Sequence, residues 1–205
     1  MNAEDRIELA LLTRDQGLAD LLAARAYLGS ETLSFLTTRG KSDCAHVAVC
    51  KCQQSSEKVL KGYFLFHQQN LNPFSGHNPL QRVLAKSGRD TPFLQKFRLV
   101  IRQHPGGFLK GVQWLEGMVP SPPATTNINK LSLPDLPMNT EYAFWDKKSC
   151  ALTLPAVYFR PRAALQAVLV ATSLCKIISA SGDAIYEKGL KDFLERFPPG
   201  SLPVS

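Results

Sequence analysis

Four potential metal ligands lie close together in the first third of the chain. Cys44, His46, Cys50 and Cys52 fall within nine residues, and thiolate and imidazole groups are ligands that zinc prefers. A structural zinc site needs four ligands around one point, but on a helix only His46 and Cys50, four residues apart, share a face. We therefore interpret the cysteines as small, half-buried side chains that pack a helical core. We predict no metal and no other cofactor.

Other patterns associated with catalysis are weak. No segment has the spacing of a phosphate-binding loop, a dinucleotide-binding fingerprint or a nucleophile elbow. The sequence Pro105-Gly106-Gly107 is typical of a helix stop, not of a loop that holds phosphate. We interpret His67 and His77 as residues at helix ends rather than as ligands or bases.

Positive charge is concentrated in one short region. The chain carries 24 basic and 17 acidic residues, a net charge of +7. Between positions 82 and 110 a single acid, Asp90, accompanies seven basic residues: Arg82, Lys86, Arg89, Lys96, Arg98, Arg102 and Lys110. Five of them would lie three or four residues apart on two successive helices and form one phosphate-binding surface if these helices are neighbours: Arg82, Lys86, Arg89, Arg98 and Arg102. No aromatic residues interleave with them, which favours contact with nucleotide or RNA phosphates over base stacking. The alternative is an ordinary solvated face.

Cysteine number and hydropathy indicate a location. Five cysteines, an odd number, in a chain whose first residues lack the features of a signal peptide favour free thiols in a reducing compartment. No stretch approaches the roughly 18 uninterrupted apolar residues that a bilayer needs. We expect a cytoplasmic protein without a membrane segment.

The periodicity of the apolar residues predicts an all-α protein, an up-and-down bundle of five or six helices without strands. Asn78-Pro79 and Thr91-Pro92 are typical of helix starts, Ser42 or Asp43 would cap the second helix, and Asp183 the last. Prolines predict a long loop over 120–160, and we expect one domain over 1–197 and a tail over 198–205. The expected helices are 4–28, 43–69, one from 79, 92–104, 108–119, 162–179 and 183–197.

The stretch 162–179 is apolar on nearly every side. Such a helix is either buried in the centre of a bundle or placed at a subunit contact. It motivates the alternative that the chain is a homodimer or a partner-docking protein with no role in nucleic-acid binding.

Four motifs resemble those of HEPN domains and occur in the order that this family uses. The stretch from Cys52 to Phe66, with Glu-Lys-Val-Leu-Lys at its centre, resembles the signature second helix, and Gly76-His77 resembles the step into the third. Thr140-Glu141-Tyr142 lies where many members have Thr-Arg-Tyr-Pro, and the stretch from Pro155 to Tyr158 is similar to the entry to the last bundle helix. Together the motifs cover residues 5–180.

The resemblance implies a helical bundle that often dimerises. The family includes noncatalytic nucleotide- or RNA-associated modules, partners of minimal nucleotidyltransferases, metal-independent ribonuclease toxins and the C-terminal domain of the chaperone sacsin. Its nuclease branch carries an arginine followed, after four to six residues, by a histidine near a late helix, where the cation holds a phosphate and the imidazole moves a proton. Glu141 stands at the position of that arginine, and no histidine follows His104. The same arginine–histidine spacing occurs elsewhere in the chain, at Arg98 with His104 and at Arg39 with His46. Such matches are expected by chance in a chain of this length.

From these observations we expect a noncatalytic module that binds nucleotide or RNA phosphates. Protein interaction is the first alternative, with a second copy, a nucleotidyltransferase or a chaperone as the partner. Metal-independent cleavage of RNA, with Arg98 and His104 as candidate catalytic residues, is the second alternative.

Overall fold

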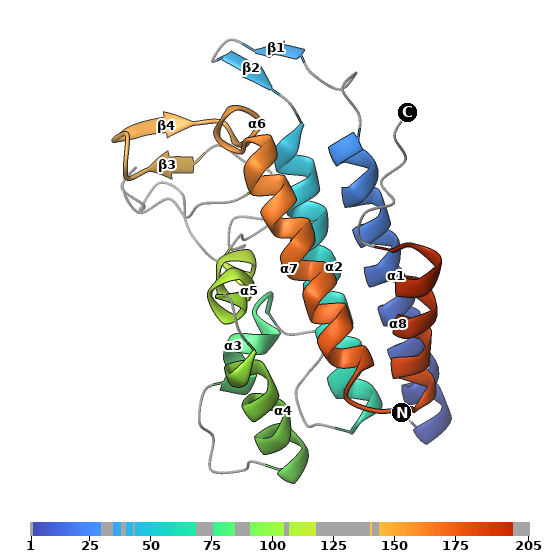
Figure 1. Cartoon of the computed structure of the whole chain (residues 1–205). Coiled ribbons are helices and arrows are strands. Elements are labelled where there is room, and N and C mark those ends of the chain that lie inside the picture. The colour runs from blue at the N-terminus through green and yellow to red at the C-terminus, as the bar shows by residue number, and fades with distance from the viewer. Residues whose placement is uncertain are drawn as a thin grey trace.

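The computed structural model describes residues 2–29, 35–37, 40–42, 44–68, 76–84, 91–104, 107–117, 140 and 144–198, and within them the protein is a helical bundle (Figure 1). The predicted all-α bundle is confirmed, with eight helices in these ranges. The elements are α1 (Ala3–Gly29), β1 (Phe35–Thr37), β2 (Gly40–Ser42), α2 (Ala45–Phe66), α3 (Pro79–Leu84), α4 (Pro92–Gln103), α5 (Phe108–Glu116), β3 (Phe144–Asp146), β4 (Ala151–Thr153), α6 (Pro155–Tyr158), α7 (Pro161–Ser179) and α8 (Ile185–Arg196).

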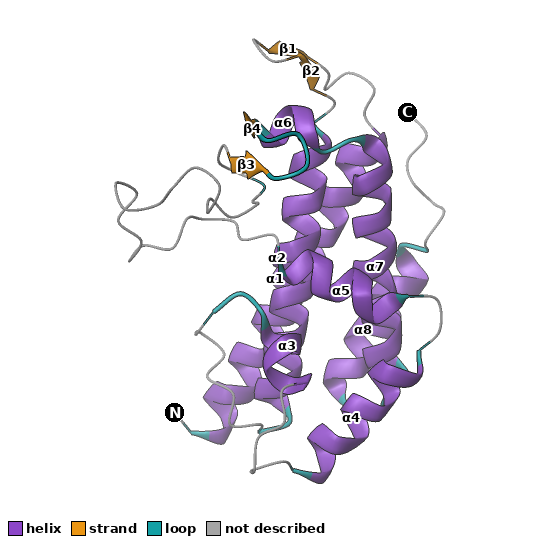
Figure 2. Cartoon of the chain, turned by 90° about the vertical axis from the view of Figure 1, so that its left-hand side faces the viewer, coloured by secondary structure: helices purple, strands orange, loops and turns teal. Residues whose placement is uncertain are grey.

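Helices α1, α2, α7 and α8 form the bundle. Helices α1 and α2 are antiparallel, and so are α7 and α8 (Figures 1 and 2). Helices α2 and α7 are parallel, because the segment from α3 to α6 leads the chain back to the end of the bundle where α2 begins. Two arginines of α1 join it to α8: Arg14 donates to the carbonyls of Ile185 and Tyr186, and Arg25 donates to the carbonyl of Phe197 and to Thr172 Oγ1. The short helix α5 packs against α2 and α7 on one side and also contacts α3 and α4.

The core lies between the long helices, where leucine, isoleucine and aromatic side chains are fully buried. One close approach depends on a glycine. A Cβ atom at Gly62 of α2 would lie 2.8 Å from the carbonyl oxygen of Ala10 in α1 and 2.8 Å from Tyr186 Oη of α8. Tyr186 is fully buried, and its hydroxyl donates to the carbonyl of Val59 at 2.6 Å. Only a residue without a side chain lets these three helices meet at this level.

The predicted helix starts at Pro79 and Pro92 are confirmed, whereas the caps predicted for α2 and α8 differ. Thr91 caps α4 as predicted, because its hydroxyl oxygen accepts from the amide of Leu94 at 3.3 Å. The residue before α2 is Cys44, in the left-handed region at φ 54°, and not Ser42, which ends β2; Asp43 lies outside the described residues. Asp183 does not cap α8 either.

Two short antiparallel hairpins, β1–β2 and β3–β4, were not predicted. Each strand has three residues, which is too short for the alternation that identifies a strand in a sequence. The second hairpin and α6 occupy residues 144–158, so the predicted loop over 120–160 is wrong for this part. Phe144 and Phe159 anchor it as buried residues; positions 118–139 lie outside the described residues.

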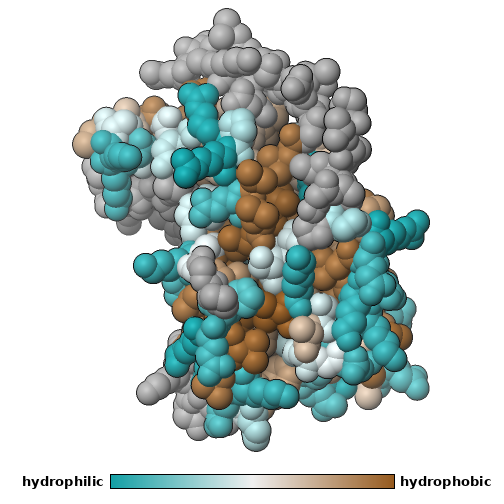
Figure 3. Space-filling model, in the orientation of Figure 1, coloured by the Kyte–Doolittle hydropathy of each residue, from teal (hydrophilic) through white to brown (hydrophobic). Residues whose placement is uncertain are grey.

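The apolar helix α7 lies in the centre of the bundle, one of the two positions that the sequence left open, and leaves one face exposed. Among the described helices it alone is long and apolar enough to cross a membrane, and over half of that stretch is buried inside the protein. The surface view shows hydrophobic surface gathered over α7 (Figure 3).

Candidate ligand-binding cleft

The structure describes three of the five residues of the predicted basic surface and contradicts the prediction at one of them, Arg98. Arg82 and Arg102 are exposed, but Arg98 is only 8% exposed and its Nε donates to the carbonyl of Val83. The helix from Pro79 ends at Leu84, and the following segment contains Ser87 and Gly88, which are poor helix formers. Lys86 and Arg89, predicted to continue the face of Arg82, lie outside the described residues.

The predicted place of Arg98 on an exposed phosphate-binding surface is therefore wrong. Arg98 is buried together with Leu94, Phe97 and Ile101, and its guanidinium group ties α4 to α3. His104, the other candidate for catalysis, is exposed at the end of α4, and its ring contacts Phe108 edge-on with 5.0 Å between centroids. A guanidinium group held by a backbone carbonyl inside the protein is poorly placed to bind a phosphate.

Charges are nevertheless divided between two parts of the described chain. The helices α3 to α7 carry a single acid, Glu116, which is buried, and seven basic residues: Arg82, Lys96, Arg98, Arg102, Lys110, Arg162 and Lys176. The acids of the described helices otherwise belong to α1, α2 and α8. The side of the bundle formed by α3 to α7 therefore favours anions.

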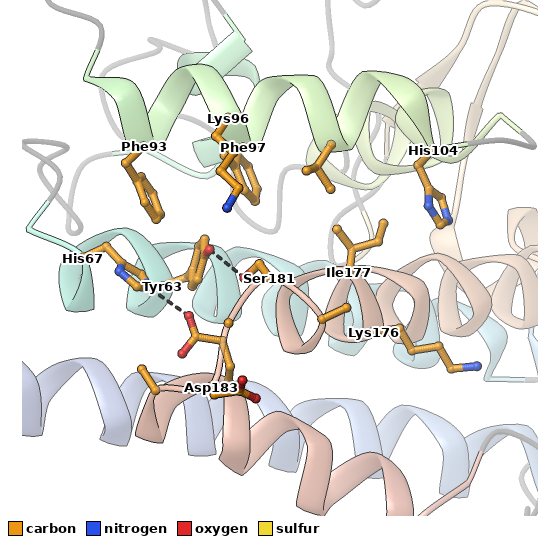
Figure 4. A pocket seen from close by; sticks show the side chains of 15 residues that line it. Tyr63, His67, Phe93, Lys96, Phe97, His104, Lys176, Ile177, Ser181 and Asp183 are labelled. Carbon is orange, nitrogen blue, oxygen red and sulfur yellow. Dashed lines mark hydrogen bonds and ion pairs between the residues drawn. The ribbon is translucent and has the colours of Figure 1, made fainter.

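A cleft of about 570 Å³ opens on this side of the protein, a volume within the range of small-molecule sites. One wall is α4, and the opposite wall is formed by the last turn of α7, the turn that follows it and the start of α8 (Figure 4). The end of α2 contributes Tyr63 and His67. Most of the lining is apolar, with Phe93 and Phe97 facing the cleft from α4.

Two hydrogen bonds hold the polar groups of the cleft in place. Tyr63 Oη lies 2.8 Å from Ser181 Oγ, and His67 Nε2 lies 2.8 Å from Glu187 Oε1. The His67 ring also stacks on Phe93, with centroids 4.6 Å apart. Burial raises the pKa of Tyr63 to about 12, so its hydroxyl stays protonated at neutral pH and does not act as a base.

Two lysines border the cleft, one on each wall. Lys96 projects from α4, while Lys176 and His104 lie at the end opposite to His67 and Phe93 (Figure 4). The exposed acid Asp183 is paired with Lys191 at 2.6 Å, which offsets its charge. Aromatic walls accept a flat ring and ammonium groups bind anions, so the cleft fits a ligand that is aromatic at one end and anionic at the other.

Sequence reasoning missed this cleft because its walls come from segments about a hundred residues apart. A signal exists on α4, where Phe93, Lys96, Val100 and His104 recur at three- and four-residue steps and so share a face. His67, interpreted as a residue at a helix end, does lie directly after α2, and its contact with Glu187 is what places it in the cleft.

Three of the five cysteines, Cys50, Cys52 and Cys175, lie in the core, whereas Cys44 is half-buried and Cys150 is exposed. Cys50 and Cys52 are buried in α2. Burial raises the pKa of the Cys52 thiol well above its usual value and raises the pKa of the Cys175 thiol to about 12. Such thiols pack and stay protonated. Within the described ranges, no three His, Cys, Asp or Glu side chains are grouped to hold a metal ion.

Comparisons with protein-family models, with curated proteins and with solved structures find no match to this chain.

Proposed function

We propose that this protein is a HEPN-like module that binds nucleotide or RNA phosphates without catalysis, and that the cleft between α4 and the end of α7 is its ligand site. The observation that carries the proposal is the combination of aromatic walls with Lys96 and Lys176 at the border of the cleft. Helices α3 to α7 expose no acid among their described residues, and the exposed acid of the cleft, Asp183, is paired with Lys191, so the charges around the cleft favour a phosphate.

Contacts between motif residues support the HEPN-like assignment. Glu57, at the centre of the motif in α2, accepts a hydrogen bond from Lys61 at 2.5 Å and lies 3.0 Å from His77 Nδ1. The segment from Pro155 to Tyr158 forms α6 directly before the long helix α7. Residues singled out separately in the sequence thus meet in space or precede the expected helix.

We propose the absence of catalysis because of the burial of Arg98 and the protonation of Tyr63. Arg98 is buried on the carbonyl of Val83, and Tyr63 stays protonated. Incubation of single-stranded RNA with the protein, followed by analysis of the products, tests this point directly. Cleavage that is abolished by His104→Ala would establish the ribonuclease alternative.

The binding site is tested with fluorescent single-stranded RNA and a labelled nucleoside triphosphate over a series of salt concentrations. We expect Lys96→Glu/Lys176→Glu to weaken binding at least tenfold, because two attractive contacts become repulsive. Lys147→Glu/Lys188→Glu changes the net charge equally at exposed positions outside the cleft and should retain most of the affinity.

A third pair distinguishes the cleft from the surface predicted from the sequence. Arg82→Glu/Arg102→Glu alters the two exposed members of that surface. If this pair abolishes binding and the lysine pair does not, the phosphates lie on the outer surface of α3 and α4. If neither ligand binds at low salt, the proposed function is wrong.

A further inference from the structure

We propose that the exposed face of α7 is a docking surface for an acidic amphipathic helix of a partner protein. This inference does not rest on the nucleotide or RNA function: the stripe borders the cleft at Lys176, but its two leucines and Arg162 lie outside the cleft lining. Its basis is the position of two leucines between two basic residues on a single helix face.

The face consists of Arg162, Leu165, Leu169 and Lys176. At 100° per residue these four positions fall within a stripe about 60° wide, and all four side chains are exposed. Leu165 is 47% exposed and Leu169 is 54% exposed, although they belong to the most apolar long helix of the bundle. Figure 3 shows this hydrophobic surface over α7.

Helix α5 packs on the face of α7 next to this stripe and does not cover the stripe itself. Helix α5 meets α7 at Gly111, where a Cβ atom would lie only 2.6 Å from Val170 Cγ2, and this close crossing covers the adjacent face. The stripe from Arg162 to Lys176 is about 21 Å long, which corresponds to about four helical turns. A partner helix of ordinary length would cover both leucines and reach both cations.

The basic residues at the two ends of the stripe favour an acidic partner. Helix α7 has no acidic residue, α4 has none, and the one acid of α5, Glu116, is buried. A second copy that placed the same stripe against this one would bring Arg162 and Lys176 close to like charges. A helix with leucines in its middle and glutamates at both ends complements the stripe. Leucines at one-turn spacing offer no stacking surface to a base, which disfavours nucleic acid here.

The test uses a labelled synthetic helical peptide of about 18 residues, with two leucines four positions apart and glutamates about 14 positions apart on the same face. A second peptide carries lysines in place of the glutamates. We expect the acidic peptide to bind the full-length protein at least tenfold more tightly than the basic one by fluorescence anisotropy. Equal affinities, or no binding of the acidic peptide, would overturn the proposal.

Variants locate the contact. Leu165→Ser/Leu169→Ser should reduce binding of the acidic peptide at least tenfold, and Arg162→Glu should weaken it while improving binding of the basic peptide. Leu12→Ser is the matched control, since Leu12 is 59% exposed on α1. Unchanged binding in the double serine variant would refute the location, and because these positions are exposed, circular dichroism should show an intact fold.

Two further readouts separate the alternatives. Light scattering of the unmutated protein should give a monomer; a dimer that Leu165→Ser/Leu169→Ser dissociates would show that a second copy covers the face instead. Affinity for RNA and for the nucleoside triphosphate should be unchanged in the double serine variant. Failure of the nucleotide function therefore leaves the docking proposal standing, and the reverse also holds.

Discussion

The carboxyl group of Glu116 joins α5 to α3. It is only 4% exposed, and its two oxygens accept from the amides of Leu80 at 2.5 Å and Gln81 at 3.0 Å, which are among the free donors at the start of α3. Burial raises its pKa to about 7, and the nearby charge of Glu57 adds to this effect, while the two amides act in the opposite direction. A carboxyl group that holds the short helix α3 in place is therefore half-ionised near neutral pH.

This pKa predicts a pH-dependent stability. The group binds its proton more tightly in the folded chain, at about 7, than in the unfolded chain, near 4.5. The free energy of unfolding should therefore fall as pH rises from about 4.5 to about 7, by up to about 3 kcal/mol from this group, and level off above. Urea unfolding at several pH values measures the change.

Glu116→Gln removes the titration and identifies its source. The amide retains one acceptor, so this variant should lose about 1 kcal/mol or more at pH 5 through one broken hydrogen bond, and should show a flatter pH profile. Glu195→Gln, at an exposed position of α8, should keep the profile of the unmutated protein. A Glu116→Gln profile as steep as that of the unmutated protein would contradict the assignment.

Helix packing around Gly62 sets the distance between α1, α2 and α8. Gly62→Ala would place a methyl group 2.8 Å from both the Ala10 carbonyl oxygen and Tyr186 Oη, so the helices must separate. We expect a loss of about 1–3 kcal/mol in the free energy of unfolding, seen as a lower thermal midpoint.

Gly117→Ala is the control for this substitution. Gly117 follows α5 with φ −76°, a conformation open to any residue, and its added Cβ would meet only carbonyls of its own helix at 3.3 Å or more. Little change is expected there, because the residue gains helix propensity and meets no rigid neighbour. If the two alanine variants are equally stable, the close approach at Gly62 is not limiting.

The helices could be predicted from the sequence, and the reason is local. Periodicity and caps such as Thr91 depend on neighbouring residues, so α1, α4, α7 and α8 begin and end within a few residues of their predicted bounds. The hairpins β1–β2 and β3–β4 could not be predicted, because three-residue strands carry no periodic signal.

The candidate site depended on long-range contacts that no local pattern contains. Arg98 was assigned to an exposed phosphate-binding surface because of its charge, but the carbonyl of Val83 offers its guanidinium group a buried partner. His67 acquired its position from Glu187, 120 residues later. The existence of a basic region was predicted; which of its side chains reach solvent depended on tertiary packing.

The division of charge across the protein gives binding a measurable salt dependence. For single-stranded RNA, each phosphate contact contributes about 0.7 to the slope of log affinity against log salt. If Lys96 and Lys176 each contact one phosphate, Lys96→Ala/Lys176→Ala should lower that slope by about 1.4, whereas Lys147→Ala/Lys188→Ala should leave it unchanged. An unchanged slope in the first pair would place the phosphates elsewhere on the basic side.

The two arginines of α1 also govern when the protein can assemble during its synthesis. Arg14 and Arg25 find their carbonyl partners on α8, 171 and 172 residues later in the chain. At bacterial and eukaryotic translation rates of about 5–20 residues per second, α8 emerges from the ribosome roughly 10–35 seconds after α1. During that interval both guanidinium groups stay hydrated and the pair α1–α2 presents an open apolar side. The nascent chain therefore exposes this apolar surface to solvent until its final helix arrives.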